Sequence, residues 1–130
     1  MQNNVYKILK TNEWEEALLT GKVVTDLDTR DGFIHLSTAS QLAATLSLFF
    51  RDIEVVVLLQ IDLEKVDKAK LVYEKIYPKT GKRNATFPHL YTQMKINQIS
   101  NTWFLERCSF DLPEEVLLQA ENQELNQKLK

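Results

Sequence analysis

The stretch from Glu54 to Asp62, EVVVLLQID, is the strongest structural signal in the chain and decides the fold. Its β-branched run places apolar residues at successive positions, which is typical of a strand covered on both faces. We therefore expect a central strand here. Strand-like segments surround it at 5–9, 22–25, 33–37, 70–77, 87–91, 94–100 and 101–110. Helical patterns occur early and at the end, so the sequence predicts an α+β protein.

The first helix is predicted over residues 13–20 from its flanking signals. Asn12 is the expected N-cap, with Glu15 at the capping-box spacing, and Gly21 is expected to end the helix. The following segment, DLDTRDG at 26–32, is rich in turn residues and is interpreted as a solvated polar loop. A calcium loop is excluded there because its fifth and sixth positions do not fit an EF-hand.

A second helix is expected to begin at Ser37 or Thr38, since Thr38 and Gln41 have the capping-box spacing. Its predicted apolar stripe consists of Leu42, Leu46 and Phe49. Beyond the central strand, segments 94–100 and 101–110 are expected to form a further pair of strands.

The length of 130 residues predicts one domain, which we place at 1–110, followed by a helical extension at 111–130. A narrow leucine stripe on that extension is expected to pack on the domain or to pair with another copy, giving a homo-oligomer. The net charge of −2 gives no general attraction to nucleic acid or anionic membranes. One cysteine, no signal-peptide pattern and no long apolar run predict a cytoplasmic protein without a membrane span.

Both histidines of the chain lie in short apolar and aromatic segments, GFIHLST and FPHLY. In extended backbone, His35 shares one face with Phe33 and Ser37. His89 similarly shares a face with Phe87 and Tyr91. Aromatic rings beside imidazoles suit a pocket for a flat polar ligand, because rings stack and imidazoles donate or accept hydrogen bonds.

Glu74, in the strand-like LVYEKIY, is the third candidate. Facing the histidines, its carboxylate could orient a ribose hydroxyl, act as a base or stabilise positive charge on a sugar. Structural roles remain open for all three residues, as core histidines and as a solvated surface charge. No histidine or cysteine pair has zinc-ligand spacing, so no metal site is expected.

The segments VYKIL, GFIHLSTASQLAATLSLFF, VVLLQID, VYEK and FPHLY, in this order and spacing, resemble the bacterial family DUF952, from about Val5 to Phe104. That family is grouped by fold with the ADP-ribosyltransferases, which implies small antiparallel sheets around a cleft with flanking helices. Two positions depart from the family pattern: Tyr73 stands where tryptophan is usual, and Thr92 where glycine is usual. Fold kinship does not by itself transfer an activity.

The resemblance implies a nucleotide cleft, with NAD as a possible substrate for ADP-ribosyl transfer or hydrolysis. In that case His35, Glu74 and His89 would be the catalytic residues. His35 would contact ribose or phosphate, Glu74 would supply the carboxylate, and His89 would contact phosphate or transfer a proton. The expected ligand-binding residues are Phe33, Ser37 and Tyr91, although Ser37 is favoured as a helix cap alone. A non-catalytic nucleotide-binding module and a purely structural role of the motif are the alternatives.

The basic segment KTGKR at 79–83 allows two interpretations. It is either a surface loop or a phosphate contact at the mouth of the cleft. It lacks the full Walker pattern, so it is not a P-loop.

Overall fold

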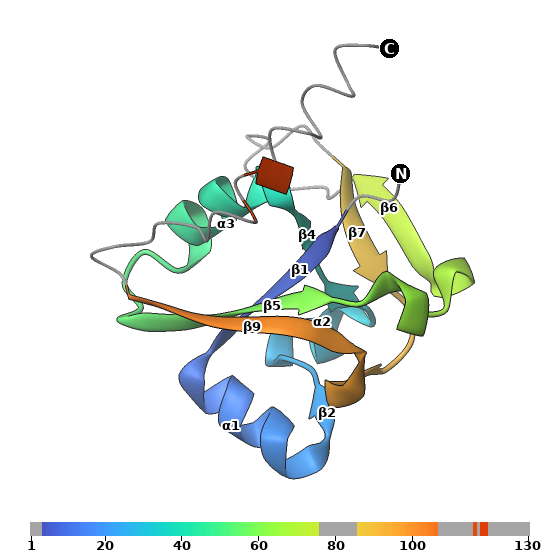
Figure 1. Cartoon of the computed structure of the whole chain (residues 1–130), viewed down its shortest axis with the longest axis horizontal. Helices are drawn as coiled ribbons and strands as arrows, with labels where there is room; N and C mark the ends of the chain where they lie inside the picture. Colours follow the sequence, from blue (N-terminus) through green and yellow to red (C-terminus); the bar gives the residue numbers. More distant parts are fainter. Residues whose placement is uncertain (1–3, 76–85, 107–115, 117, 120–130) are drawn as a thin grey trace.

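The computed structural model describes residues 4–75, 86–106, 116, 118 and 119. Within these ranges, antiparallel strands form three sheets, and short helices lie along the chain between them (Figure 1). This mixture confirms the predicted α+β class. The basic segment 79–83 and nearly all of the extension at 111–130 lie outside the described residues, as does Cys108.

The largest sheet has the strand order β4-β1-β5-β9, with every neighbouring pair antiparallel. Its strands are β1 (Val5–Lys10), β4 (Ser37–Thr38), β5 (Val55–Ile61) and β9 (Ile99–Glu106). Leu58 of β5 lies opposite Ile8 on one side and Trp103 on the other. The central position predicted for EVVVLLQID is therefore confirmed.

Buried side chains cover both faces of β5, because successive residues of a strand point to opposite sides. Val57 and Leu59 belong to a cluster that includes Leu9, Ile34 and Leu90. The opposite face has its own cluster, which consists of Tyr6, Ile8, Ala39, Leu42, Leu46, Val56, Leu58, Leu105 and Val116. Two-sided burial explains why the run carries almost no polar residue.

A smaller sheet has the order β3-β7-β6 and carries both histidines, His35 on β3 and His89 on β7. Its strands are β3 (Ile34–His35), β7 (Thr86–Leu90) and β6 (Leu71–Lys75). A two-stranded sheet pairs β2 (Lys22–Val23) with β8 (Met94–Lys95). The expected pairing of 94–100 with 101–110 is wrong, because β8 joins β2 whereas β9 joins β5.

The predicted strand at 33–37 is divided between two sheets. His35 ends β3, which pairs with β7, and Ser37 begins β4, which pairs with β1. Leu36 lies between them, and its N–H donates to the carbonyl of Pro88 at 3.1 Å. This division links the small sheet to the large one next to the histidine.

Helix α1 (Thr11–Thr20) begins earlier than predicted. Its N-cap is Lys10, whose backbone N–H donates to the carboxylate of Glu13 at 2.8 Å, so the expected Asn12 and Glu15 pair is wrong. The helix ends at Gly21, as predicted, in the left-handed conformation that glycine adopts readily.

Helix α3 (Leu42–Phe49) follows a 3₁₀ turn (Ala39–Gln41). Thr38 begins this turn, and its N–H donates to the side chain of Gln41 at 3.0 Å, which confirms the predicted cap. Leu42 and Leu46 are buried as expected, but Phe49 is 64% exposed and is not part of the stripe. Two further 3₁₀ turns (Leu63–Lys65 and Lys68–Lys70) precede β6, and a last one (Ile96–Gln98) precedes β9.

Candidate functional site

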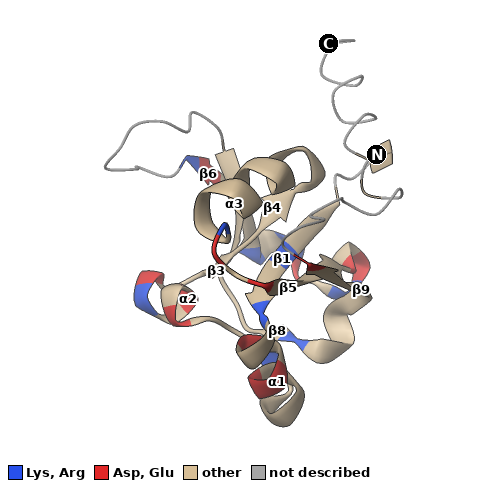
Figure 2. Ribbon diagram, turned by 90° about the vertical axis from the view of Figure 1, so that its left-hand side faces the viewer, with Lys and Arg blue, Asp and Glu red and all other residues tan. Residues whose placement is uncertain are grey.

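The segment interpreted as a polar loop at 26–32 is instead a helix, α2 (Asp26–Asp31), beside β3 (Figure 2). Thr25 caps it: its hydroxyl accepts from the N–H of Asp28 at 3.1 Å, and its own N–H donates to the Asp28 carboxylate at 3.0 Å. Gly32 ends the helix with a φ of 83°. The prediction failed because this reciprocal cap outweighs the low helix propensity of aspartate.

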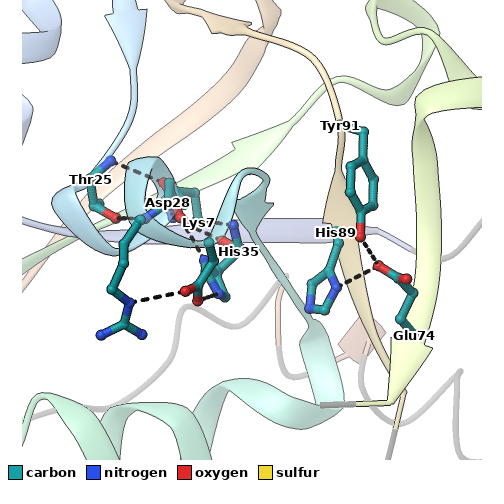
Figure 3. Close-up of polar contacts among 9 residues, drawn as sticks. Lys7, Thr25, Asp28, His35, Glu74, His89 and Tyr91 are labelled. Carbon is teal, nitrogen blue, oxygen red and sulfur yellow. Dashed lines mark hydrogen bonds and ion pairs between the residues drawn. The ribbon is translucent and has the colours of Figure 1, made fainter. Parts of the chain in front are cut away.

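The Asp28 carboxylate is fully buried and holds His35 in place. One oxygen lies 2.8 Å from Nδ1 of His35 and accepts the His35 backbone N–H at 2.9 Å. The ammonium of Lys7 lies 2.8 Å from the other oxygen and also donates to the His35 carbonyl at 2.9 Å. Nε2 of His35 faces Asp31 at 2.9 Å. Both ring nitrogens of His35 are therefore occupied by carboxylates (Figure 3).

Burial and charge act in opposite directions on this group. Burial alone would raise the pKa of Asp28, but the hydrogen bond from His35 and the charge of Lys7 hold the pKa of that carboxyl well below its usual range. Burial lowers the pKa of the Lys7 ammonium, and the attraction to Asp28 opposes this. Asp28 is thus an ionised buried carboxylate that needs its partners.

His89 lies directly opposite His35 in the pairing of β3 with β7. Its Nδ1 is 2.9 Å from Oε1 of Glu74, which reaches across from β6. The Tyr91 hydroxyl donates to the same oxygen at 2.5 Å. The hydrogen bonds from Tyr91 and His89 lower the pKa of Glu74, and the Glu74 carboxylate in turn raises the pKa of Tyr91.

Phe33 lies at the centre of these side chains. Its ring stacks on His89 with centroids 4.1 Å apart and planes inclined by 23°. It also lies 4.6 Å from the ring of His35 and 5.3 Å from that of Tyr91. The two imidazoles are 5.6 Å apart. We call Phe33, His35, Glu74, His89 and Tyr91 the histidine cluster.

The structure thus brings together five of the six residues singled out from the sequence. The sixth, Ser37, is buried on β4, with its hydroxyl 3.4 Å from that of Thr45. The expected helix cap is Thr38 rather than Ser37. His89 is not presented to solvent: its side chain is 4% exposed, whereas that of His35 is 25% exposed.

Sequence reasoning missed Lys7, Asp28 and Asp31. Two signals could have found the first two. Lys7 is a lone charge inside the apolar strand VYKIL, and Thr25 and Asp28 have the spacing of a reciprocal helix cap. A lysine in a buried strand needs a nearby carboxylate, which the sequence alone does not locate.

A shallow pocket of about 360 Å³ lies at the end of α3, lined by Ser47, Leu48, Phe49, Arg51, Asp52 and Ile53. It shares no residue with the histidine cluster. Among the described residues, no group of three or more His, Cys, Asp or Glu side chains could hold a metal ion. No helix in the described part of the chain is long and apolar enough to cross a membrane.

The fold and the cluster define a small α+β protein with two adjacent histidines, each bonded to a carboxylate, on a short antiparallel sheet. The chain belongs to the family described as "Protein of unknown function (DUF952)", whose profile matches residues 8–102. This confirms the resemblance seen in GFIHLST and FPHLY.

Solved structures of one bacterial protein are similar to this chain. The crystal structure of protein CC0527 from Caulobacter crescentus has a TM-score of 0.67 and 30% identity, covering 85% of this chain and 89% of that chain. Its solution NMR structure has a TM-score of 0.66 and 31% identity, covering 81% and 86% respectively. No curated protein matches this chain significantly.

Proposed function

We propose that the histidine cluster binds a nucleotide of the NAD class and cleaves the bond between its ribose and nicotinamide, by hydrolysis or by ADP-ribosyl transfer. The proposal includes the finer fold assignment, an ADP-ribosyltransferase-like arrangement of antiparallel sheets around a ligand site. One observation carries it: two imidazoles, a carboxylate and two aromatic rings from separate segments meet at one place. Core residues need only local partners, whereas groups that act on one substrate must converge.

The cluster offers groups suited to each part of such a ligand. Tyr91, 43% exposed, has a ring surface on which nicotinamide can stack. Glu74, whose side chain is 37% exposed and whose pKa is lowered, provides a negative charge for a cation-like sugar. His35, fixed by Asp28, contacts the ribose or phosphates from the neighbouring strand.

The reaction balances without an added cofactor. The bond from C1′ of the ribose to the pyridinium nitrogen breaks, and nicotinamide leaves as a neutral molecule with the bonding electrons. Water, or the hydroxyl of an acceptor, then adds to C1′. Its proton passes to Glu74 and on to solvent.

A non-catalytic binding module is the second candidate, and two hydrogen bonds to Glu74 favour it. Oε1 of Glu74 already accepts from both His89 and Tyr91, which reduces its capacity to take a proton from water. Under this alternative the cluster binds the same nucleotide and releases it unchanged.

Titration calorimetry with NAD, ADP-ribose and nicotinamide tests the proposal, and mass spectrometry of released nicotinamide separates its two versions. Glu74→Gln keeps the size of the side chain and removes its charge, and Glu64→Gln on an outer turn is the matched control. We expect binding in the wild type and in Glu64→Gln, with nicotinamide release lost in Glu74→Gln. Heat without release supports the binding module, and no heat from any of the three compounds refutes both versions.

A further inference from the structure

The two histidines of the cluster differ in what their ring nitrogens contact. Both nitrogens of His35 face carboxylates, Nδ1 toward Asp28 and Nε2 toward Asp31. In the part of the chain that the structure describes, His89 has only one such partner, Glu74 at Nδ1. Within the described residues, Nε2 of His89 is the one buried side-chain polar atom without a hydrogen-bond partner. Buried polar atoms are nearly always paired, so this atom calls for an explanation.

The contact with Glu74 decides which hydrogen bond Nε2 can make. An ionised carboxylate only accepts, so Nδ1 of His89 is the nitrogen that donates to Glu74. In the neutral form of the ring, Nε2 is then the acceptor nitrogen, and the partner it lacks is a donor such as a hydroxyl. In Figure 3 this nitrogen points away from Glu74.

Phe33 packs on the face of the ring that carries this nitrogen. Its ring lies over His89 and also contacts the rings of His35 and Tyr91. Phe33 itself is only half-buried and belongs to neither α2 nor β3, because it lies in the link between them directly after Gly32. A ring on a short link can move without breaking a strand or a helix.

We propose that Phe33 is a displaceable cover, and that a ligand with a flat ring and a neighbouring hydroxyl replaces it and donates that hydroxyl to Nε2 of His89. A nucleoside has both features, its base for stacking and its ribose for the hydrogen bond. The identity of this ligand rests on the proposed function, whereas the movement of Phe33 does not. Nε2 of His89 is then a hydrogen-bond acceptor for the ligand, beside the Glu74 carboxylate that takes the proton in the proposed reaction.

Diethyl pyrocarbonate tests the cover, because it attaches to accessible unprotonated imidazole nitrogens and the chain has only two histidines. We measure the modification rate of His89 by peptide mass spectrometry in 0 to 1 M urea. Movement of Phe33 alone gives a slow rate that does not change with urea, since little surface is exposed. A rate that rises steeply with urea shows that only global unfolding exposes His89, which overturns the proposal.

Phe33→Ala provides the second readout. We expect this substitution to raise the modification rate of His89 about tenfold or more. This factor corresponds to a wild-type population in which Phe33 is displaced in at most about one molecule in ten. The matched control is Phe49→Ala, an exposed aromatic on α3, which leaves the rate unchanged. An unchanged His89 rate in folded Phe33→Ala also overturns the cover.

ADP-ribose separates the cover from its ligand. We expect it to protect His89 and to bind Phe33→Ala more tightly than the wild type, because the cover no longer competes with it. If Phe33→Ala exposes His89 but ADP-ribose neither binds nor protects His89, the displacement of Phe33 is supported and the nucleotide as its ligand is refuted.

Discussion

The buried carboxylate of Asp28 offers the sharpest test of how the site is built. Its side chain is 0% exposed. The carboxylate pairs with the Lys7 ammonium, is hydrogen-bonded to the His35 ring and accepts a hydrogen bond from the backbone N–H of Thr25. Asp28→Asn keeps the size of the side chain and removes its charge. The substitution leaves the ammonium of Lys7, only 4% exposed, without the carboxylate to which it is hydrogen-bonded.

The expected loss in the free energy of unfolding follows from the unpaired ammonium of Lys7. Breaking a buried ion pair by removing one partner costs about 3–5 kcal/mol, because the remaining charge is desolvated and unpaired. The amide oxygen of the introduced asparagine still accepts a hydrogen bond, so we expect a value near the lower limit, about 3 kcal/mol. Domains of this kind have a total stability of roughly 5–15 kcal/mol, so the variant is measurable but much weakened.

Urea unfolding followed by circular dichroism measures this loss. The matched control is Asp26→Asn, an exposed residue of the same helix, for which we expect a change within about 0.5 kcal/mol. Lys7→Met in the Asp28→Asn background should cost less than the sum of the two single variants, since no charge is then left unpaired. A loss below about 1 kcal/mol in Asp28→Asn, or additive effects in the double variant, refutes the reasoning.

Three further predictions concern pH, the helix ends and the first capping interaction. The folded protein holds the pKa of Asp28 below its ordinary value of 3.8, so the destabilisation by Asp28→Asn should be complete at neutral pH and shrink as the pH falls below that value; a difference independent of pH in urea titrations would contradict it. Gly32→Ala and Gly21→Ala should each cost roughly 1–2 kcal/mol, because both positions have a positive φ that alanine adopts only with strain. The added methyl group meets no neighbouring atom, so this backbone strain is the whole expected cost; an unchanged unfolding midpoint would show that the backbone relaxes freely. Glu13→Ala should cost about 1 kcal/mol through loss of its bond to the Lys10 N–H, whereas the exposed Glu15→Ala should cost almost nothing; the reverse order in thermal unfolding would restore the cap expected from the sequence.

The central strand and the cluster residues could be predicted because their signals are local. An apolar run of β-branched residues predicts a strand buried on both faces, and Val56 to Leu59 are fully buried. Extended backbone alternates its side chains, which predicts Phe33 and His35 on one face, and their rings are 4.6 Å apart. The same reasoning groups Ser37 with them, but the chain passes from one sheet to the other at Leu36.

Other features could not be predicted because they depend on partners far away in sequence. The sequence pattern predicts a loop where helix α2 lies, since its aspartates disfavour a helix until Thr25 and Asp28 cap it. It also predicts that β8 and β9 pair, but each has its partner elsewhere in the chain. Pairing is decided by which apolar faces meet, and a single segment does not contain that information.

The sequence by itself determined the α+β class, the central strand, the DUF952 family and five of the residues that meet in the cluster. Only the tertiary structure decided how those residues differ: His35 is held between two carboxylates, whereas His89 is buried with Phe33 stacked on its ring and with one nitrogen that has no partner among the described residues. The physical reason is that burial and hydrogen bonding depend on distances between segments. The sequence identifies a histidine but does not contain the partners of its ring nitrogens.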